Sequence, residues 1–457
     1  MDIFSGDYRR DVEALDAALE SDKSFDLIKR ETDFGASRQT FFYVEGFCAG
    51  GVLQKLMIHL SDAQYFDAAN LPVSDAAVCE SVTDAATAVL SGKTVMIAKG
   101  AMPVVIDARS YPARDATEPE NDRVLRGSRD GFVETLLFNV AMVRRRIRSA
   151  SFRAEHITVG GSSKCDVALL YMKERVDLHL LSTLREKLSS LTTDSVTMGH
   201  ESIAECLMKK RWFDPFPKVR LTERPDVASA HVLEGSVVLI VDNSPEAMLF
   251  PTSLFDFLQE ADDFYFPPVT GTYLRILRHI VFLFSIFLVP VWYLAVMNQD
   301  IIPGWLSFMI PDDPGEIPII IQLFLVEFSL DGLKLAYLNT PDTLSSSVSV
   351  VGGLLLGDFA VKVGWLSPDV ILYMAFASIA NYTQSSYELG YAFKYLRMIT
   401  LALTAAFNVW GFAAGVFVCI LLPAVNKTLS GTSYLYPLIP YNGKALRRLI
   451  TRPKKFD

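Results

Sequence analysis

Three ionisable side chains lie in a stretch of sequence that is apolar enough to enter a lipid bilayer. Residues 323–338 read LFLVEFSLDGLKLAYL and carry Glu327, Asp331 and Lys334. On a helix, spacings of four and then three residues place these side chains on one face. A charge at the bilayer centre costs about 3 kcal/mol, so we expect this face to line water or another part of the protein.

A second pair of charges, Asp358 and Lys362, lies four residues apart in the next apolar stretch. One hypothesis is structural: Asp331 neutralises Lys334, Asp358 neutralises Lys362, and the pairs lock helices together. The other is functional: the acids contact ions along a path, or contact a neighbouring subunit. We favour the second hypothesis because Glu327 has no obvious partner on its own helix.

The apolar segments that must position these charges lie in the second half of the chain. Residues 280–297 are uncharged and long enough to cross a bilayer. In the segment 348–364, Gly352, Gly353 and Gly357 would allow close helix packing and movement during gating. Because one segment is short, we predict about four full spans plus one short re-entrant or broken segment. The other segments cover 317–338, 370–383 and 398–426.

The charges that flank these segments predict their orientation. Arg275 and Arg278 precede the first span, acidic residues follow it, and Lys444, Arg447 and further basic residues follow the last span. By the positive-inside rule, both ends of the chain face the cytoplasm. We therefore predict an all-α polytopic membrane domain at 271–440 and a basic cytoplasmic tail at 441–457.

The first 270 residues have the mixed charged and apolar pattern of a soluble fold, in which short β-rich runs alternate with amphipathic helical stretches. The run VLSGKTVMI at 89–97 resembles VLEGSVVLI at 232–240, and we interpret each glycine as the end of a helix before a β-hairpin. The alternative is a chance similarity of short strands. We predict two related cytosolic α/β subdomains, at 1–150 and 151–270. The first thirty residues lack the apolar run of a signal peptide.

Motifs for enzymatic chemistry are scarce in the sequence. The run VGGSSK at 159–164 lacks the spacing of a phosphate-binding loop, and His200-Glu201 does not extend to H-E-x-x-H. The five cysteines are scattered without C-x-x-C spacing. We therefore predict no enzyme activity, no cofactor and no metal site. A net charge of −9 also argues against nucleic-acid binding.

A basic cluster closes the helix that we predict at 132–148. Arg144, Arg145, Arg146 and Arg148 lie at its carboxyl end, where the helix dipole favours cations. One interpretation is a well-capped helix with a solvated basic end. The other is that these arginines contact acidic surfaces of a neighbouring subunit or anionic lipid headgroups.

Several long motifs, taken together and in order, resemble the GerA family of spore germination proteins over about residues 40–422. The motifs are RGSRDGFVETLLFNVAMVRRRIRS, TERPDVASAHVLEGSVVLIVDNSPEAMLFPTSLFDFLQEADDFY, LNTPDTLSSSVSVVGGLLLGDFAVKVGWLSPDVILYMA and SSYELGYAFKYLRM. The resemblance implies a multi-pass protein of the inner spore membrane with its N-terminal region in the spore core. It further implies a pentamer-like homo-oligomer that releases monovalent cations during germination, together with other germination membrane proteins such as a small membrane partner.

These expectations combine into one primary hypothesis, an oligomeric cation-conducting channel subunit. Two alternatives stay open. A secondary transporter would use an intramembrane carboxylate as an ion carrier and would show an inverted repeat among its membrane segments. A non-conducting scaffold would use the intramembrane charges only to fix contacts within germination complexes.

Overall fold

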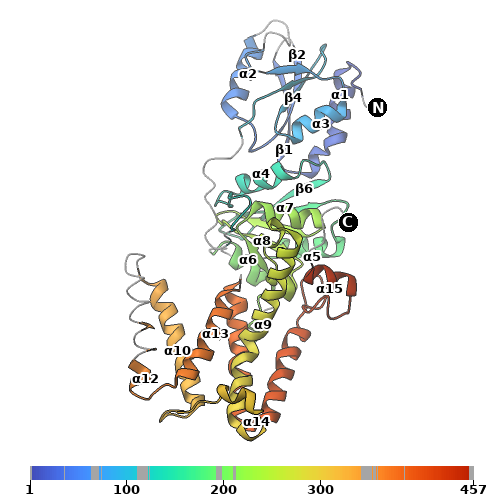
Figure 1. Cartoon of the computed structure of the whole chain (residues 1–457). Helices are drawn as coiled ribbons and strands as arrows, with labels where there is room; N and C mark the ends of the chain where they lie inside the picture. Colours follow the sequence, from blue (N-terminus) through green and yellow to red (C-terminus); the bar gives the residue numbers. More distant parts are fainter. Residues whose placement is uncertain are drawn as a thin grey trace. The chain divides into compact units, whose positions relative to one another are not determined.

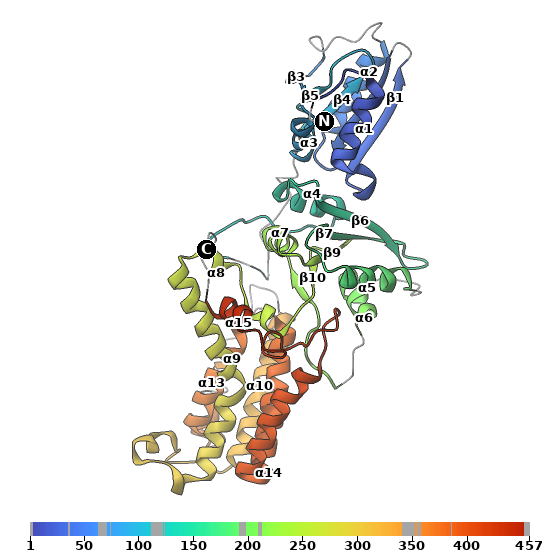
Figure 2. The same cartoon turned by 90° about the vertical axis from the view of Figure 1, so that its right-hand side faces the viewer.

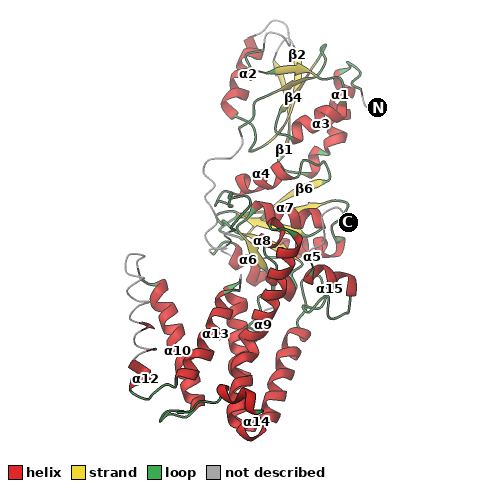
Figure 3. Ribbon diagram, in the orientation of Figure 1, coloured by secondary structure: helices red, strands yellow, loops and turns green. Residues whose placement is uncertain are grey.

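The chain forms two compact units in the computed structural model. The first, here called the α/β unit, comprises residues 1–210, 218–252 and 429–431, and the second, the helical unit, comprises 211–217, 253–428 and 432–457. All ten strands assigned in the described residues belong to the α/β unit, and the long apolar helices belong to the helical unit (Figures 1 and 3). The structure describes residues 3–34, 37–62, 71–73, 75–110, 122, 124–191, 198–208, 213–340, 352–353, 357, 359–384 and 386–451.

The first half of the α/β unit is a five-stranded antiparallel sheet with helices on both faces. Its strand order is β1-β2-β4-β5-β3. Alternate residues of β2 and β4 face opposite sides, so Phe42 and Val95 pack under α1 and α3, whereas Phe41 and Met96 pack under α2. The elements are α1 (Tyr8–Leu19), β1 (Leu27–Phe34), β2 (Ser37–Val44), α2 (Gly50–Asp62), β3 (Ala76–Val78), α3 (Val82–Leu90), β4 (Thr94–Ala98) and β5 (Val104–Ile106).

The second half repeats this architecture. Its strand order is β6-β7-β9-β10-β8, with α4 and α7 on one face and α5 and α6 on the other. The central strand β9 is buried along its whole length, as β4 is in the first half. The elements are α4 (Leu136–Arg146), β6 (Phe152–Val159), β7 (Cys165–Met172), α5 (Leu178–Ser189), α6 (His200–Leu207), β8 (Arg220–Thr222), α7 (Pro225–Glu234), β9 (Val237–Val241) and β10 (Ala247–Phe250).

The shared strand order confirms the internal repeat that the sequence predicts. Gly92 and Gly235, the glycines of the two aligned runs, both have a left-handed φ, of 91° and 103°, directly after α3 and α7. At Gly235 a Cβ atom would lie 2.7 Å from the Arg175 carbonyl oxygen. Only glycine therefore fits both the backbone conformation and the space at this position.

Several details of the α/β unit differ from the sequence-based prediction. Strands β1, β3 and β8 were not predicted, because β3 and β8 contain only three residues each and β1 carries five consecutive polar residues at 29–33. The helix predicted at 132–148 is shorter, since Thr135 is its N-cap and Glu134 precedes it. Helix α4 packs on the second sheet although it lies before residue 151, the predicted start of the second subdomain.

The helical unit begins with short elements that pack against its long helices. Leu254 and Leu258 of the 3₁₀ helix η3 (Leu254–Leu258) share a core with Ile286 and Leu389. The unit thus starts before residue 271, the predicted start of the membrane domain. The elements that follow are α8 (Asp262–Tyr265), α9 (Pro268–Met297), η4 (Gln299–Ile301), η5 (Gly304–Met309), α10 (Ile319–Leu338), α12 (Ala360–Lys362), α13 (Pro368–Tyr382), α14 (Tyr387–Val425) and α15 (Gly443–Ile450).

Within the described residues, two helices are long and apolar enough to cross a membrane, α9 and α14. Helix α14 is interrupted at Asn408, which has a φ of 53° and a ψ of −129°. A Cβ atom on Gly415 would lie 2.7 Å from Thr400 Cγ2, whereas these residues would be about 22 Å apart along a continuous helix. The helix therefore folds into two antiparallel arms, 387–407 and 409–425 (Figure 2).

This hairpin corrects the prediction of one continuous span at 398–426. Asn408 fixes the turn by exchanging two side-chain hydrogen bonds with Asn298, which ends α9, at 2.6 and 2.9 Å. Gly411, Gly415 and Cys419 recur every fourth residue on the second arm, and their small size permits the close approach of the first arm. Eight of the 17 residues of the predicted span at 348–364 lie outside the described residues.

Candidate functional site: a buried ion cluster in the helical unit

A cluster of charged side chains joins α10 to the first arm of α14. Glu327 on α10 is 7% exposed and accepts two hydrogen bonds from Arg397 Nη2, at 2.7 and 3.0 Å. Lys394 Nζ lies 3.4 Å from Glu327 Oε1 and also forms an ion pair with Asp331. Arg397 Nη1 donates to the Ser285 carbonyl oxygen on α9 at 2.6 Å. The cluster therefore ties three helices together.

This geometry revises both sequence-based hypotheses about the charges. Asp331 forms its ion pair with Lys394, so its predicted pairing with Lys334 is wrong. Glu327 has two cationic partners on α14, although it has none on its own helix. Lys394 and Arg397 were not predicted as site residues, because they precede the uncharged run at 398–426 that predicts the last span. Helix α14 begins at Tyr387, so these cations lie on the same helix as that run.

Lys334 occupies a different environment at the end of α10. Its Nζ atom lies 4.7 Å from the ring centroid of Tyr391, 4.8 Å from that of Tyr387 and 5.8 Å from that of Tyr382. Each distance is within the range of a cation–π interaction. The ammonium group is thus held by aromatic faces supplied by α13 and α14.

A small cavity of about 20 Å³ lies inside the cluster, enough for about one water molecule. Its lining includes Arg397 and Asn381. Among the described residues, Arg397 Nε and Asn381 Oδ1 are buried without a hydrogen-bond partner. A donor and an acceptor that line one small cavity suit a bound water, because buried polar groups are rarely left unsatisfied.

The remaining intramembrane predictions are only partly within the described residues. Asp358 lies outside them, so its predicted pairing with Lys362 of α12 stays a prediction. A Cβ atom on Gly352 would lie 2.9 Å from a Leu333 methyl group, which shows close packing against α10. A Cβ atom on Gly353 or Gly357 would meet no described atom within 4 Å.

The basic cluster on α4 separates into buried and exposed members. Arg144 is 0% exposed and its Nε and Nη2 donate to the Asp26 carboxylate at 2.7 and 2.9 Å. Its guanidinium lies 4.2 Å over the Phe152 ring. Arg144 therefore joins the two repeats internally, and its predicted contact with a subunit or headgroup is wrong. Arg146 Nη2 donates a hydrogen bond to Ser128 at 2.7 Å. Arg145 and Arg148 are exposed, and for them the contact with a subunit or headgroup stays a prediction.

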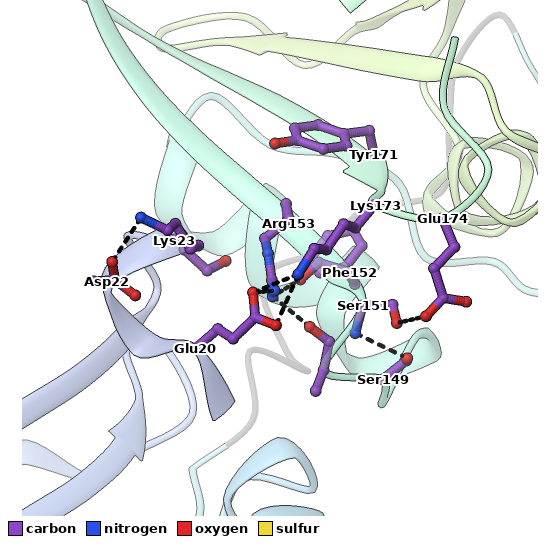
Figure 4. Close-up of polar contacts among 12 residues, drawn as sticks. Glu20, Asp22, Lys23, Ser149, Ser151, Phe152, Arg153, Tyr171, Lys173 and Glu174 are labelled. Carbon is purple, nitrogen blue, oxygen red and sulfur yellow. Dashed lines mark hydrogen bonds and ion pairs between the residues drawn. The ribbon is translucent and has the colours of Figure 1, made fainter. Parts of the chain in front are cut away.

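A second set of ion pairs lies beside this buried joint. Figure 4 shows Glu20, which follows α1, pointing toward Arg153 of β6 and Lys173, which follows β7. Lys173 Nζ lies 2.8 Å from both carboxylate oxygens of Glu20. The hydrogen bond from Lys173 holds the pKa of the Glu20 carboxyl below its usual value. The two repeats are therefore joined by a buried pair and by a more exposed one.

Comparisons with known proteins agree with the resemblance seen in the sequence. Stage V sporulation protein AF of Bacillus subtilis is 40% identical over 80% of this chain and 74% of its own length. The motifs around Glu223, Trp365 and Tyr387 predict this relative, and the identity confirms it. Spore germination protein A1 of the same organism is 25% identical over 79% of this chain and 76% of its own length.

A solved structure also matches the chain, that of the N-terminal domain of the A subunit of the Bacillus megaterium spore germinant receptor GerK3. The identity is 20%, the TM-score is 0.40, and the match covers 55% of this chain and 96% of that chain. A family model described as Bacillus/Clostridium GerA spore germination protein matches residues 13–456. The chain therefore belongs to the GerA family of spore germination proteins.

Proposed function

We propose that this protein is a subunit of an oligomeric channel that releases monovalent cations across the inner spore membrane during germination. The observation that carries the proposal is the cluster of Glu327, Asp331, Lys394 and Arg397, in which all but the partly exposed Asp331 are buried among helices with long apolar runs. Charges at such positions are costly, and in membrane proteins they commonly mark an ion path or a moving contact. Membership of a spore germination family supplies the biological setting.

The paired state of the cluster suggests how it would act. Because Glu327 is bonded to Arg397, its carboxylate is not available to attract a passing cation in this conformation. Conduction would require α10 to move relative to α14, which would separate the pairs and expose the acids. The cluster would then be a latch that holds the closed state.

The rest of the proposed assembly follows the sequence expectations. A pentamer-like ring would multiply each acidic group by the number of subunits. Both termini would face the spore core, with the α/β unit as an assembly collar. Arg145 and Arg148 are exposed, and in this assembly they would contact a neighbouring subunit or lipid headgroups. Other germination membrane proteins, including a small membrane partner, would modulate opening.

A flux measurement tests the latch. The full chain and Glu327→Gln would be purified, sized in detergent, and reconstituted into vesicles loaded with a potassium-sensitive dye. The variant keeps the side-chain volume but removes the charge that holds Arg397 and Lys394, so we expect a potassium flux several times that of the original chain. Asp312→Asn, which alters an exposed carboxylate outside the cluster, is the matched control and should leave the flux unchanged.

The same measurement separates the competing functions. A non-conducting scaffold is favoured by the fact that both acids of the cluster are paired within one chain. It predicts no flux from either protein even when both assemble. A secondary transporter predicts a flux that saturates with ion concentration, and current recordings from planar bilayers would then show no single-channel steps. A monomer in detergent would contradict the ring.

A further inference from the structure

Three tyrosine rings enclose the Lys334 ammonium group, and this arrangement is distinct from the buried ion pairs beside it. Tyr387 and Tyr391 are one helical turn apart on α14, and Tyr382 is the last residue of α13. The cation comes from a third helix, α10. An aromatic site assembled from two helices therefore holds a positive charge that belongs to another element.

The chemistry of this site matches that of aromatic cages that bind ammonium ligands. The negative faces of aromatic rings attract a cation, and cages of several rings recognise quaternary ammonium groups. Here the three ring centroids lie 4.7 to 5.8 Å from Nζ. Tyr382 and Tyr387 are 60% and 67% exposed in the single chain, so the cage is accessible from outside.

The surrounding charges also favour a replaceable cation. Glu327 and Asp331 are balanced by Lys394 and Arg397, so Lys334 is the surplus positive charge of the group. Its removal would leave a neutral cluster beside an empty aromatic cage. A small external cation could then enter and restore the same total charge.

We propose that Tyr382, Tyr387 and Tyr391 form a binding site for a small organic ammonium ion, and that the Lys334 side chain is its tethered occupant. The ligand class is a methylated or primary ammonium group that fits between three ring faces. When Lys334 withdraws, the site is open to such a ligand. The proposal concerns binding, and it holds whether or not the protein conducts ions.

Tetramethylammonium is a suitable probe, and Lys334→Met is the variant that empties the cage at similar side-chain volume. Calorimetric titration of the full-length variant in detergent, at constant ionic strength, should show saturable binding at least about tenfold tighter than to the original chain. Lys334→Arg keeps the occupant and should bind as weakly as the original. Lys444→Met, on α15, is the matched control and should also bind weakly.

Two further comparisons identify the rings as the binding groups. In the Lys334→Met background, Tyr391→Leu should abolish binding, whereas Tyr391→Phe should retain it because the ring face remains. Neopentyl alcohol, which is uncharged and similar in shape, should not bind. Equal binding of both probes, or unchanged binding after Tyr391→Leu, would overturn the proposal.

A measurement on chains that keep Lys334 covers the case in which Lys334→Met fails to fold. Reductive methylation followed by peptide mass spectrometry should modify Lys334 more slowly than the exposed Lys444. Tyr391→Leu should raise the rate at Lys334 by about tenfold, since one ring face is lost. An unchanged rate would show that the rings do not hold the ammonium group.

Discussion

Two buried arginine–carboxylate pairs, one in each unit, differ in how fully they are satisfied. Arg144 is 0% exposed and uses all three of its nitrogens, on Asp26, Ser24 and nearby carbonyl oxygens. Arg397 is 2% exposed and leaves Nε without a partner among the described residues. A network completed by protein groups fixes a structure, whereas one beside a cavity of about one water's volume can exchange a protein contact for a water-mediated one. The first pair is therefore a joint, and the second is suited to be a switch.

The largest effect should come from breaking the joint. Arg144→Met leaves Asp26 buried without its cation, which should destabilise the α/β unit by about 3–5 kcal/mol. Hydrogen exchange of β7 and β9 in the full chain measures this, because the amides of these interior strands report the opening of the whole unit. Arg148→Met removes an exposed arginine from the same segment and should change stability by less than about 0.5 kcal/mol. Equal effects would show that burial of Arg144 does not matter.

Breaking the Arg397–Glu327 pair should lower the free energy of unfolding by less. In Arg397→Met, Lys394 remains 3.4 Å from Glu327, and the neighbouring cavity could admit water. We expect a loss of about 1–3 kcal/mol, measured by thermal unfolding in detergent followed by tryptophan fluorescence, since Trp292 lies in the helical unit. Lys444→Met serves as the control. A loss as large as that of Arg144→Met would mean that the two clusters are equally rigid.

A smaller loss of stability should follow from a change in the α14 hairpin, where close packing rather than charge holds the arms together. A Cβ atom on Gly415 would meet both Thr400 Cγ2 at 2.7 Å and the Thr400 Cα atom at 2.8 Å. Gly415→Ala should therefore destabilise the helical unit by about 1–2 kcal/mol, because the arms must separate. Gly332→Ala on α10 meets no described atom within 4 Å, and it should be neutral or slightly stabilising. If both variants behave alike in thermal unfolding, the arms do not pack closely.

The sequence predicts the two repeats of the α/β unit but not the α14 hairpin or the partners of Glu327. Both repeats were recognised because the runs that lead into their central strands keep the same residues around a glycine, and the left-handed backbone conformation there favours glycine. The hairpin in α14 was missed because the turn lies within an uncharged run and is marked by only one amide side chain, Asn408. The partners of Glu327 were missed because helix pairing between distant segments leaves no local pattern, and Lys394 and Arg397 lie outside the uncharged run.

The joint was missed for a related reason. Arg144 follows the pattern of a helix end with exposed cations, and its neighbours Arg145 and Arg148 are indeed exposed. Its carboxylate partner lies 118 residues away in the chain. Nothing in the local sequence separates one arginine of such a cluster from the next, since burial depends on which face meets the other repeat.

The smallest effect should come from a half-exposed ion pair on the second sheet. Burial disfavours the charge of Glu155, but hydrogen bonds from Arg185 and Tyr171 hold the pKa of its carboxyl below the usual value. The stabilisation is present above the unfolded pKa of about 4.5 and is lost as pH falls through the lower folded value. Glu155→Gln should therefore cost less than about 1 kcal/mol at pH 7, and the difference should shrink toward pH 3.

Hydrogen exchange of β6 and β7 at a series of pH values measures that difference, with Glu186→Gln as an exposed control on α5. Protection must be corrected for intrinsic exchange at each pH, so that only the difference between variant and original chain is compared. A difference that stays constant from pH 7 to pH 3 would assign the effect to lost packing. Convergence of the two curves would instead show that the Glu155–Arg185 ion pair contributes a small, solvent-screened stabilisation. The Arg144–Asp26 pair should contribute a large one, because both pairs join an arginine to a carboxylate and differ chiefly in burial.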